Sequence, residues 1–229
     1  MPAEIITRRN LPHWYIPGAA HFITFRLQGS LPQSVLAQLR AVREASLRRL
    51  GDRPTPSEKG RIDKQAFGRF DRELDRGLEP TWLRQPSVAA IVRQSLYFAN
   101  EKTYRLLAYS IMPNHVHILI QPCEEIASDG DGEEAPDCGS PLSKIMQSSK
   151  SFTSHRINEH LGRSGVLWQA ESYDHWVRDD DELERIIDYI AANPVKAGLV
   201  KQPHEWFFCS AHDRFLQDGS NHTWLDLPR

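Results

Sequence analysis

Two apolar segments joined by a short turn constrain the fold of this chain more than any other feature. Tyr104 to Ile111 and Asn114 to Ile120 are rich in apolar and β-branched residues, and Met112-Pro113-Asn114 connects them. Segments of this composition with so short a connection are typical of neighbouring antiparallel strands. We therefore expect a β-hairpin at this point of the chain.

The rest of the chain mixes one further strand with several helices. His21 to Leu27 has the aromatic and β-branched composition of a strand. Helical periodicity is found in Gln33 to Leu50, Val88 to Phe98, Leu142 to Leu161, and the stretch from Asp180 to Asn193, where Asn193-Pro194 is expected to end the helix. This order predicts an α+β fold with helices packed on one face of a small antiparallel sheet.

Two segments differ from this pattern within what we expect to be a single domain over residues 1–229. Gly51 to Pro80 is polar and charged, with a short surface helix expected from Asp63 to Gly77, and we interpret 51–80 as an insertion outside the core. Residues 123–140 contain seven acidic side chains and no Lys or Arg, the composition of a flexible loop. The rest of the chain has 28 basic and 23 acidic side chains, so the net charge of −2 conceals a weakly basic body.

His115 and His117 alternate with apolar residues on the second strand of the expected hairpin. Because successive side chains of a strand point to opposite faces, the two imidazoles lie on one face and Val116 and Ile118 on the other. Two adjacent imidazoles can bind one divalent cation. The alternative is a pair of hydrogen-bonded or solvent-facing histidines, which is the commoner case for so loose a motif.

The helix that begins near Asp180 adds two polar side chains. Tyr189 and Asn193 are four residues apart and project from one side of the helix, with Tyr189 at the border of the apolar stripe. A phenol there could pack at an interface, or it could attack a phosphodiester beside a metal ion that the Asn193 amide helps to hold. Tyr173 is a rival nucleophile, but adjacent residues of an extended segment point to opposite faces, so it gains little from Asp174.

Several short motifs, taken together, resemble one known family. In chain order they are Leu11-Pro12-His13-Trp14-Tyr15-Ile16-Pro17-Gly18, His21-Phe22-Ile23-Thr24-Phe25-Arg26, Met112-Pro113-Asn114-His115-Val116-His117, Trp168-Gln169, Ser172-Tyr173-Asp174-His175, Tyr189, and the run from Asn193 to Val200. In order and spacing they are similar to the REP-associated tyrosine transposases, relatives of insertion-sequence transposases in the HUH single-strand endonuclease superfamily. The resemblance covers most of the chain outside 51–80 and the acidic loop.

The resemblance implies a ferredoxin-like, RNA-recognition-motif-like domain with His115 and His117 on a central strand and the catalytic tyrosine on a C-terminal helix. It implies that Tyr189 is the nucleophile and that His115, His117 and Asn193 are ligands of Mg²⁺ or Mn²⁺. The implied substrate is single-stranded DNA at hairpin-forming palindromic repeats, which is cut and rejoined through a 5′-phosphotyrosine.

DNA contacts are expected from basic and aromatic residues near the N-terminus and on later elements. The candidates are Arg8, Arg9, His13, Trp14, Tyr15, Lys144, Lys150 and His175. Packing is an equal alternative for the N-terminal aromatic residues. We expect Trp168 and Trp176 to pack rather than to stack on bases.

Two other functions stay open from the sequence. One is a non-catalytic nucleic-acid-binding protein on the same fold, and the other is a metal-dependent hydrolase, for which the chain lacks an HxHxD run after His115. No segment approaches the roughly 18 consecutive apolar residues of a membrane span, and the three cysteines show no CxxC spacing. These features favour a cytoplasmic protein without membrane contact. We expect a monomer or a homodimer.

Overall fold

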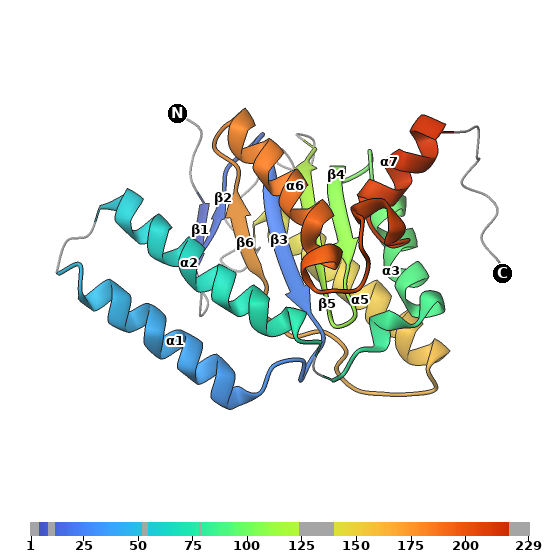
Figure 1. Ribbon diagram of the computed structural model, residues 1–229, viewed down its shortest axis with the longest axis horizontal. Coiled ribbons are helices and arrows are strands. Elements are labelled where there is room, and N and C mark those ends of the chain that lie inside the picture. Colours follow the sequence, from blue (N-terminus) through green and yellow to red (C-terminus); the bar gives the residue numbers. More distant parts are fainter. Residues whose placement is uncertain (1–4, 9–11, 52–54, 78, 124–139, 220–229) are drawn as a thin grey trace, which may run out of the picture.

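The computed structural model describes residues 5–8, 12–51, 55–77, 79–123 and 140–219 (Figure 1). Its main sheet has four antiparallel strands in the order β4-β5-β3-β6. The strands are β3 (His21–Arg26), β4 (Tyr104–Ile111), β5 (His115–Pro122) and β6 (Tyr173–Trp176). The expected hairpin is confirmed, because β4 and β5 pair antiparallel on either side of residues 112–114.

Helices cover both faces of this sheet. On one face lie α3 (Pro86–Ala99) and α5 (Pro141–His160), which pack on the larger core, and on the other lie α2 (Pro56–Asp75) and α6 (Asp180–Lys196). In Figure 1, α6 crosses in front of the sheet and α5 lies behind it. The α+β class is confirmed, but the expectation that helices lie on one face is corrected.

Both faces of the central strands are apolar enough to need a cover, which is why a second layer of helices is required. On β5, Val116, Ile118 and Ile120 belong to the larger core, whereas Leu119 belongs to a smaller cluster under α6. On β3, Phe22 joins that smaller cluster. The two imidazoles of β5 alternate with the larger-core residues and therefore lie on the α6 side of the sheet.

The order β3-α3-β4-β5-α5-β6, with these strand neighbours, is the ferredoxin-like arrangement. A helical hairpin of α1 (Gln33–Arg48) and α2 is inserted between β3 and α3. The segment 51–80, interpreted as an insertion, contains α2. This helix spans 20 residues and is longer than the Asp63 to Gly77 surface helix that the sequence predicts.

The remaining elements lie at the two ends of the chain or connect the helices. They are β1 (Ile5–Arg8), β2 (Pro12–Tyr15), the 3₁₀ turns η1 (Trp82–Arg84) and η2 (Pro203–Glu205), and α7 (Ser210–Gly219). Strands β1 and β2 form a separate two-stranded sheet. No helix in the described part of the chain is long and apolar enough to cross a membrane.

Helix α6 continues through Pro194 to Lys196, so the expectation that Asn193-Pro194 ends it is wrong. Pro194 lacks an amide hydrogen, but the helix resumes because Ala197 N donates to Asn193 O at 2.9 Å and Pro194 is buried by packing. Gly198 then adopts a φ of +69°, at which the helix ends. Asn193 therefore keeps helical geometry one turn beyond Tyr189.

Candidate active site

Strand β5 brings the two imidazoles together as the alternation predicts. The Nε2 atoms of His115 and His117 lie 3.0 Å apart, and both side chains are fully buried. Neighbouring strand β3 fixes His117 through Thr24, whose hydroxyl lies 2.8 Å from His117 Nδ1. The Nε2 atoms of the two histidines therefore face a common point.

The preceding residue, Asn114, sets the tautomer of His115. Asn114 Nδ2 donates to Leu74 O at 3.2 Å, which leaves its Oδ1 facing His115 Nδ1 at 2.7 Å. An amide oxygen only accepts hydrogen bonds, so His115 Nδ1 carries the hydrogen and Nε2 keeps its lone pair. Burial, followed by the neighbouring His117, lowers the pKa of His115 to about 3, and the imidazole is neutral.

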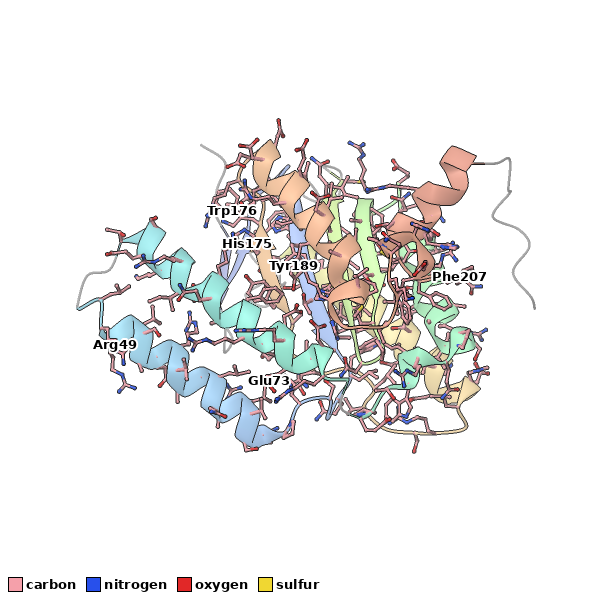
Figure 2. The ribbon with its side chains drawn as sticks, in the orientation of Figure 1. Arg49, Glu73, His175, Trp176, Tyr189 and Phe207 are labelled. Carbon is pink, nitrogen blue, oxygen red and sulfur yellow. The ribbon has the colours of Figure 1, made fainter. Side chains whose placement is uncertain are left out.

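Helix α6 adds the two residues predicted from its spacing. Asn193 is fully buried, and its Nδ2 lies 3.1 Å from His117 Nε2. The Tyr189 ring meets the His117 ring edge to face, with 5.8 Å between centroids. Figure 2 labels Tyr189 beside α6, in front of the sheet. The Asn193 Oδ1 atom has no hydrogen-bond partner among the described residues.

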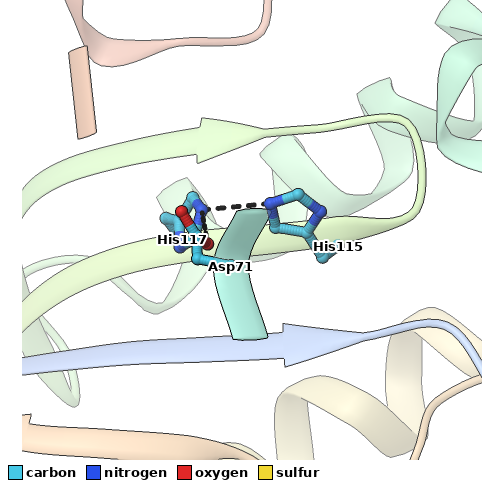
Figure 3. A group of neighbouring side chains, drawn as sticks. All are labelled: Asp71, His115 and His117. Atoms are coloured by element: carbon cyan, nitrogen blue, oxygen red, sulfur yellow. Dashed lines mark hydrogen bonds and ion pairs between the residues drawn. The ribbon is translucent and has the colours of Figure 1, made fainter. Parts of the chain in front are cut away.

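Helix α2 supplies a carboxylate that the sequence analysis missed. Asp71 is buried; its Oδ1 lies 3.3 Å from His117 Nε2, and its Oδ2 accepts the hydrogen of the Tyr189 hydroxyl. Figure 3 shows Asp71 reaching from α2 toward the two imidazoles of β5. One signal could have revealed it, because Phe67, Asp71 and Leu74 follow i, i+4, i+7 spacing and place an acid on the apolar stripe of a helix.

Asp71, His115 and His117 form a buried group whose ligand atoms all lie within 4.8 Å of one another, and this group could hold a metal ion. Two ligand atoms that are each about 2.1 Å from one ion and about 90° apart lie about 3 Å from each other, as the two Nε2 atoms do. Exchanging the oxygen and nitrogen of the Asn193 amide would bring a fourth ligand atom to the same point.

The electrostatics of the group also favour a cation. Burial alone would raise the pKa of Asp71, but the neighbouring His117 and His115 imidazoles and the Tyr189 hydroxyl bring it below its usual value, so the carboxylate is ionised. Burial and the Asp71 carboxylate raise the pKa of Tyr189 far above its usual value, so the phenol keeps its hydrogen. A buried, ionised carboxylate next to two imidazole nitrogens is a group of ligands that a divalent ion can bind.

Helix α2 covers this group. His115, His117 and Asn193 have no exposed surface, and Phe67 of α2 stacks on Tyr173 of β6 with 4.0 Å between ring centroids. A cavity of about 130 Å³ borders His115, with Asp75 and Arg84 in its wall.

The candidate DNA-contact residues lie in several different settings. Tyr15 is buried and stacks on His21, which is the packing alternative. Lys150 Nζ donates to the backbone oxygens of Gln169 and Ala170, and His175 Nε2 lies 3.1 Å from Glu182 Oε1 at the start of α6. Neither side chain extends freely into solvent.

The other candidates are exposed, or their side chains are not described. Lys144 is exposed on α5. Arg8 lies on β1, and His13 and Trp14 lie on β2. Arg9 and most of the acidic loop, residues 124–139, lie outside the described residues.

The tryptophans expected to pack do so to different degrees. Trp168 is buried, and its indole Nε1 donates to Thr153 Oγ1 at 2.8 Å. Trp176 is half-buried on β6, with the Arg178 guanidinium 5.7 Å from its ring centroid.

Comparisons with known proteins agree on one group of relatives. A REP-associated tyrosine transposase of Escherichia coli K12 is 27% identical over 112 residues, which are 49% of this chain and 57% of that protein. A Haemophilus influenzae protein provisionally named a REP-associated tyrosine transposase is 28% identical over 109 residues, which are 48% of this chain and 60% of that protein. The resemblance to the REP-associated tyrosine transposases is confirmed. The matched part spans less than two thirds of the length of either relative.

The fold also agrees with that of a REP-associated tyrosine transposase. The solved structure of one such protein bound to a REP hairpin covers 97% of this chain and 98% of that chain, with a TM-score of 0.51 and 16% sequence identity. This likeness shows that the two chains share a fold. No family model matches the chain.

Proposed function

We propose that this chain is a metal-dependent tyrosine transposase that cleaves and rejoins single-stranded DNA at hairpin-forming repeats through a 5′-phosphotyrosine on Tyr189. The observation that carries the proposal is that one phenol, one carboxylate and two imidazoles, from α6, α2 and β5, converge at one buried point. The relatives that share the family name, and the solved relative bound to a REP hairpin, support the choice of substrate.

The proposed cofactor is Mg²⁺ or Mn²⁺, held by His115, His117 and Asp71, with the Asn193 amide oxygen as a further ligand. Carboxylate and amide oxygens suit these ions, and imidazole also binds Mn²⁺. When bound, such an ion would polarise the scissile phosphate and stabilise the negative charge that develops on it.

In the proposed cleavage step, Tyr189 Oη forms a bond to phosphorus while the bond from phosphorus to the 3′ oxygen breaks. The phenol hydrogen moves to Asp71 Oδ2, which already accepts it in a hydrogen bond. The 3′ oxygen leaves with the bonding electrons and takes a proton from solvent, giving a free 3′ hydroxyl. Rejoining is the reverse attack by a 3′ hydroxyl, because the phosphotyrosine conserves the phosphodiester bond energy.

A metal-dependent hydrolase is the second candidate, and one observation favours it. Asp71 is the additional acidic ligand whose absence from the local sequence counted against a water-activating site. The two candidates differ in the role of Tyr189. A hydrolase would still cleave DNA after Tyr189→Phe, whereas the transposase would not.

The cleavage test uses the full chain with Mn²⁺ and three DNA substrates: a single strand with hairpin-forming repeats, the same strand with scrambled repeats, and a blunt duplex. We expect cleavage of the first substrate to be fastest, with none by Tyr189→Phe and activity retained by Tyr173→Phe. Equal cleavage of the duplex, or full cleavage by Tyr189→Phe, would refute the proposal.

The metal proposal is tested without DNA by titrating Mn²⁺ and following its binding by electron paramagnetic resonance. We expect wild type to bind one Mn²⁺ ion and His175→Ala to bind it with the same affinity. His117→Ala should bind Mn²⁺ at least about tenfold more weakly, because even the loss of a group that only supports a ligand weakens metal binding 10-fold to 100-fold. His175 is the matched control, because it is a half-buried histidine that is hydrogen bonded to Glu182. Equal affinities for wild type and His117→Ala would exclude the site.

A further inference from the structure

The inserted α1–α2 hairpin has a strongly basic surface. Among its described residues, nine exposed side chains are Lys or Arg and one, Glu44, is a carboxylate. The nine are Arg40, Arg48, Arg49, Lys59, Arg61, Lys64, Arg69, Arg72 and Arg76. Since the chain as a whole has a net charge of −2, this concentration of positive charge is local, and such a surface attracts a polyanion.

Three of these cations form one row along α2, which we call the basic row: Arg61, Lys64 and Arg72. At 100° per residue, Arg61 and Arg72 lie within about 20° of each other around the helix axis, and Lys64 lies about 60° from Arg61 and about 80° from Arg72. The row extends about 16 Å along the helix axis, at 1.5 Å per residue. In the described part of the chain, none of the three forms an ion pair with a carboxylate, whereas Arg43 and Arg76 do.

The basic row lies beside the candidate active site. Arg72 directly follows Asp71, so its side chain is displaced by about 100° around the helix from the carboxylate that accepts the Tyr189 hydrogen bond. Beyond the end of α2, Arg76 and Arg84 line the cavity that borders His115. Because α2 covers the site, a strand that approaches Tyr189 from this side passes the basic row.

We propose that Arg61, Lys64 and Arg72 dock the sugar-phosphate backbone of the single-stranded DNA that the site cleaves. The proposal rests on the proposed function and extends it by assigning the inserted hairpin a role in holding substrate. Lys and Arg side chains pair with phosphate oxygens, and contacts to phosphate carry no sequence information. The contacts are therefore independent of base sequence.

The test compares wild type with two triple variants of equal charge change. One is Arg61→Gln/Lys64→Gln/Arg72→Gln, and the control is Lys102→Gln/Arg105→Gln/Arg156→Gln, whose three cations are exposed on other elements. Binding of a fluorescent oligothymidylate is measured by anisotropy between about 50 and 200 mM salt. The plot of log K against log salt has a negative slope, and each lost single-strand phosphate contact makes this slope less steep by about 0.7. The slope of the row variant should therefore be less steep by about 2, and the variant should bind the oligonucleotide about a hundredfold more weakly at 0.1 M salt.

In the single variant Arg72→Gln, the salt dependence should be less steep by about 0.7. This variant gives a result even if the triple variant folds poorly. An unchanged slope in these variants while wild type still binds and cleaves DNA would overturn the docking surface alone. An equal loss in the control triple would also overturn it, since charge anywhere would then suffice. Failure of wild type to bind the oligonucleotide at all would overturn both this proposal and the proposed function.

Discussion

Replacing Tyr189 by Phe removes a single oxygen from a buried hydrogen bond. That oxygen donates to Asp71 Oδ2, a carboxylate oxygen in a side chain that is only 6% exposed. Among the described residues, Oδ2 accepts one other hydrogen bond, a long one from Asn193 Nδ2 at 3.5 Å. The substitution therefore leaves an ionised, buried oxygen with little to stabilise it.

The expected cost follows from the charge of the acceptor. A hydrogen bond to a charged group contributes about 1.5–3 kcal/mol to stability. For a domain of this size, each kcal/mol lowers Tm by about 2–4 °C. We therefore expect the metal-free Tyr189→Phe protein to unfold about 3–12 °C below wild type.

Thermal unfolding in the presence of a chelator, followed by circular dichroism, measures this cost. Tyr173→Phe is the matched control, because Tyr173 packs on the same Phe67 ring but its hydroxyl forms no hydrogen bond in the described part of the chain. Its Tm should stay within about 1–2 °C of wild type. Equal Tm values for the two variants would refute the assigned Tyr189 hydrogen bond.

Two further predictions concern stability outside the candidate site. Burial lowers the pKa of His21 below its usual value, against the opposing effects of Ile16 O and Asp174, so the unfolded chain binds a proton that the folded protein excludes. The stability that His21 contributes is present above about pH 6.5 and is lost as the pH falls, by at most about 1.4 kcal/mol per pH unit. In guanidinium unfolding measured at several pH values, His21→Phe should therefore show a weaker pH dependence of stability below about pH 6.5. The same pH dependence in His21→Phe and wild type would contradict this prediction. Asp213 of α7 accepts hydrogen bonds from Arg93 at 2.7 Å and from the hydroxyls of Tyr97 and Tyr109. Asp213→Asn should therefore lower the free energy of unfolding by about 3–5 kcal/mol. A loss below about 1 kcal/mol would show that these hydrogen bonds do not hold α7 in place.

Local patterns were enough to predict the elements that carry three of the site residues. Period-two alternation on β5 and i, i+4 spacing on α6 depend only on backbone geometry, so the positions of His115, His117 and Tyr189 follow from the sequence. The rule for proline failed at Asn193, because tertiary packing stabilises the last turn of α6 despite the missing hydrogen bond.

The contribution of α2 could not be predicted in the same way. Its many charged residues are typical of a solvent-exposed helix, and its contact with the sheet is formed across a chain separation that local periodicity does not report. Asp71 lies 44 positions before His115, yet both residues belong to one buried group. The second layer of helices was missed for the same reason.

The identity of the nucleophile is the central claim, and mapping a covalent adduct tests it most directly. The full chain is incubated with Mn²⁺ and with single-stranded DNA that carries the hairpin-forming repeats flanking its gene. After denaturation, the peptide that retains DNA is identified by mass spectrometry. The account predicts a 5′-phosphotyrosine on Tyr189, formed only with the divalent ion and absent from Tyr189→Phe. An adduct on Tyr173, or an undiminished adduct in Tyr189→Phe, would contradict it.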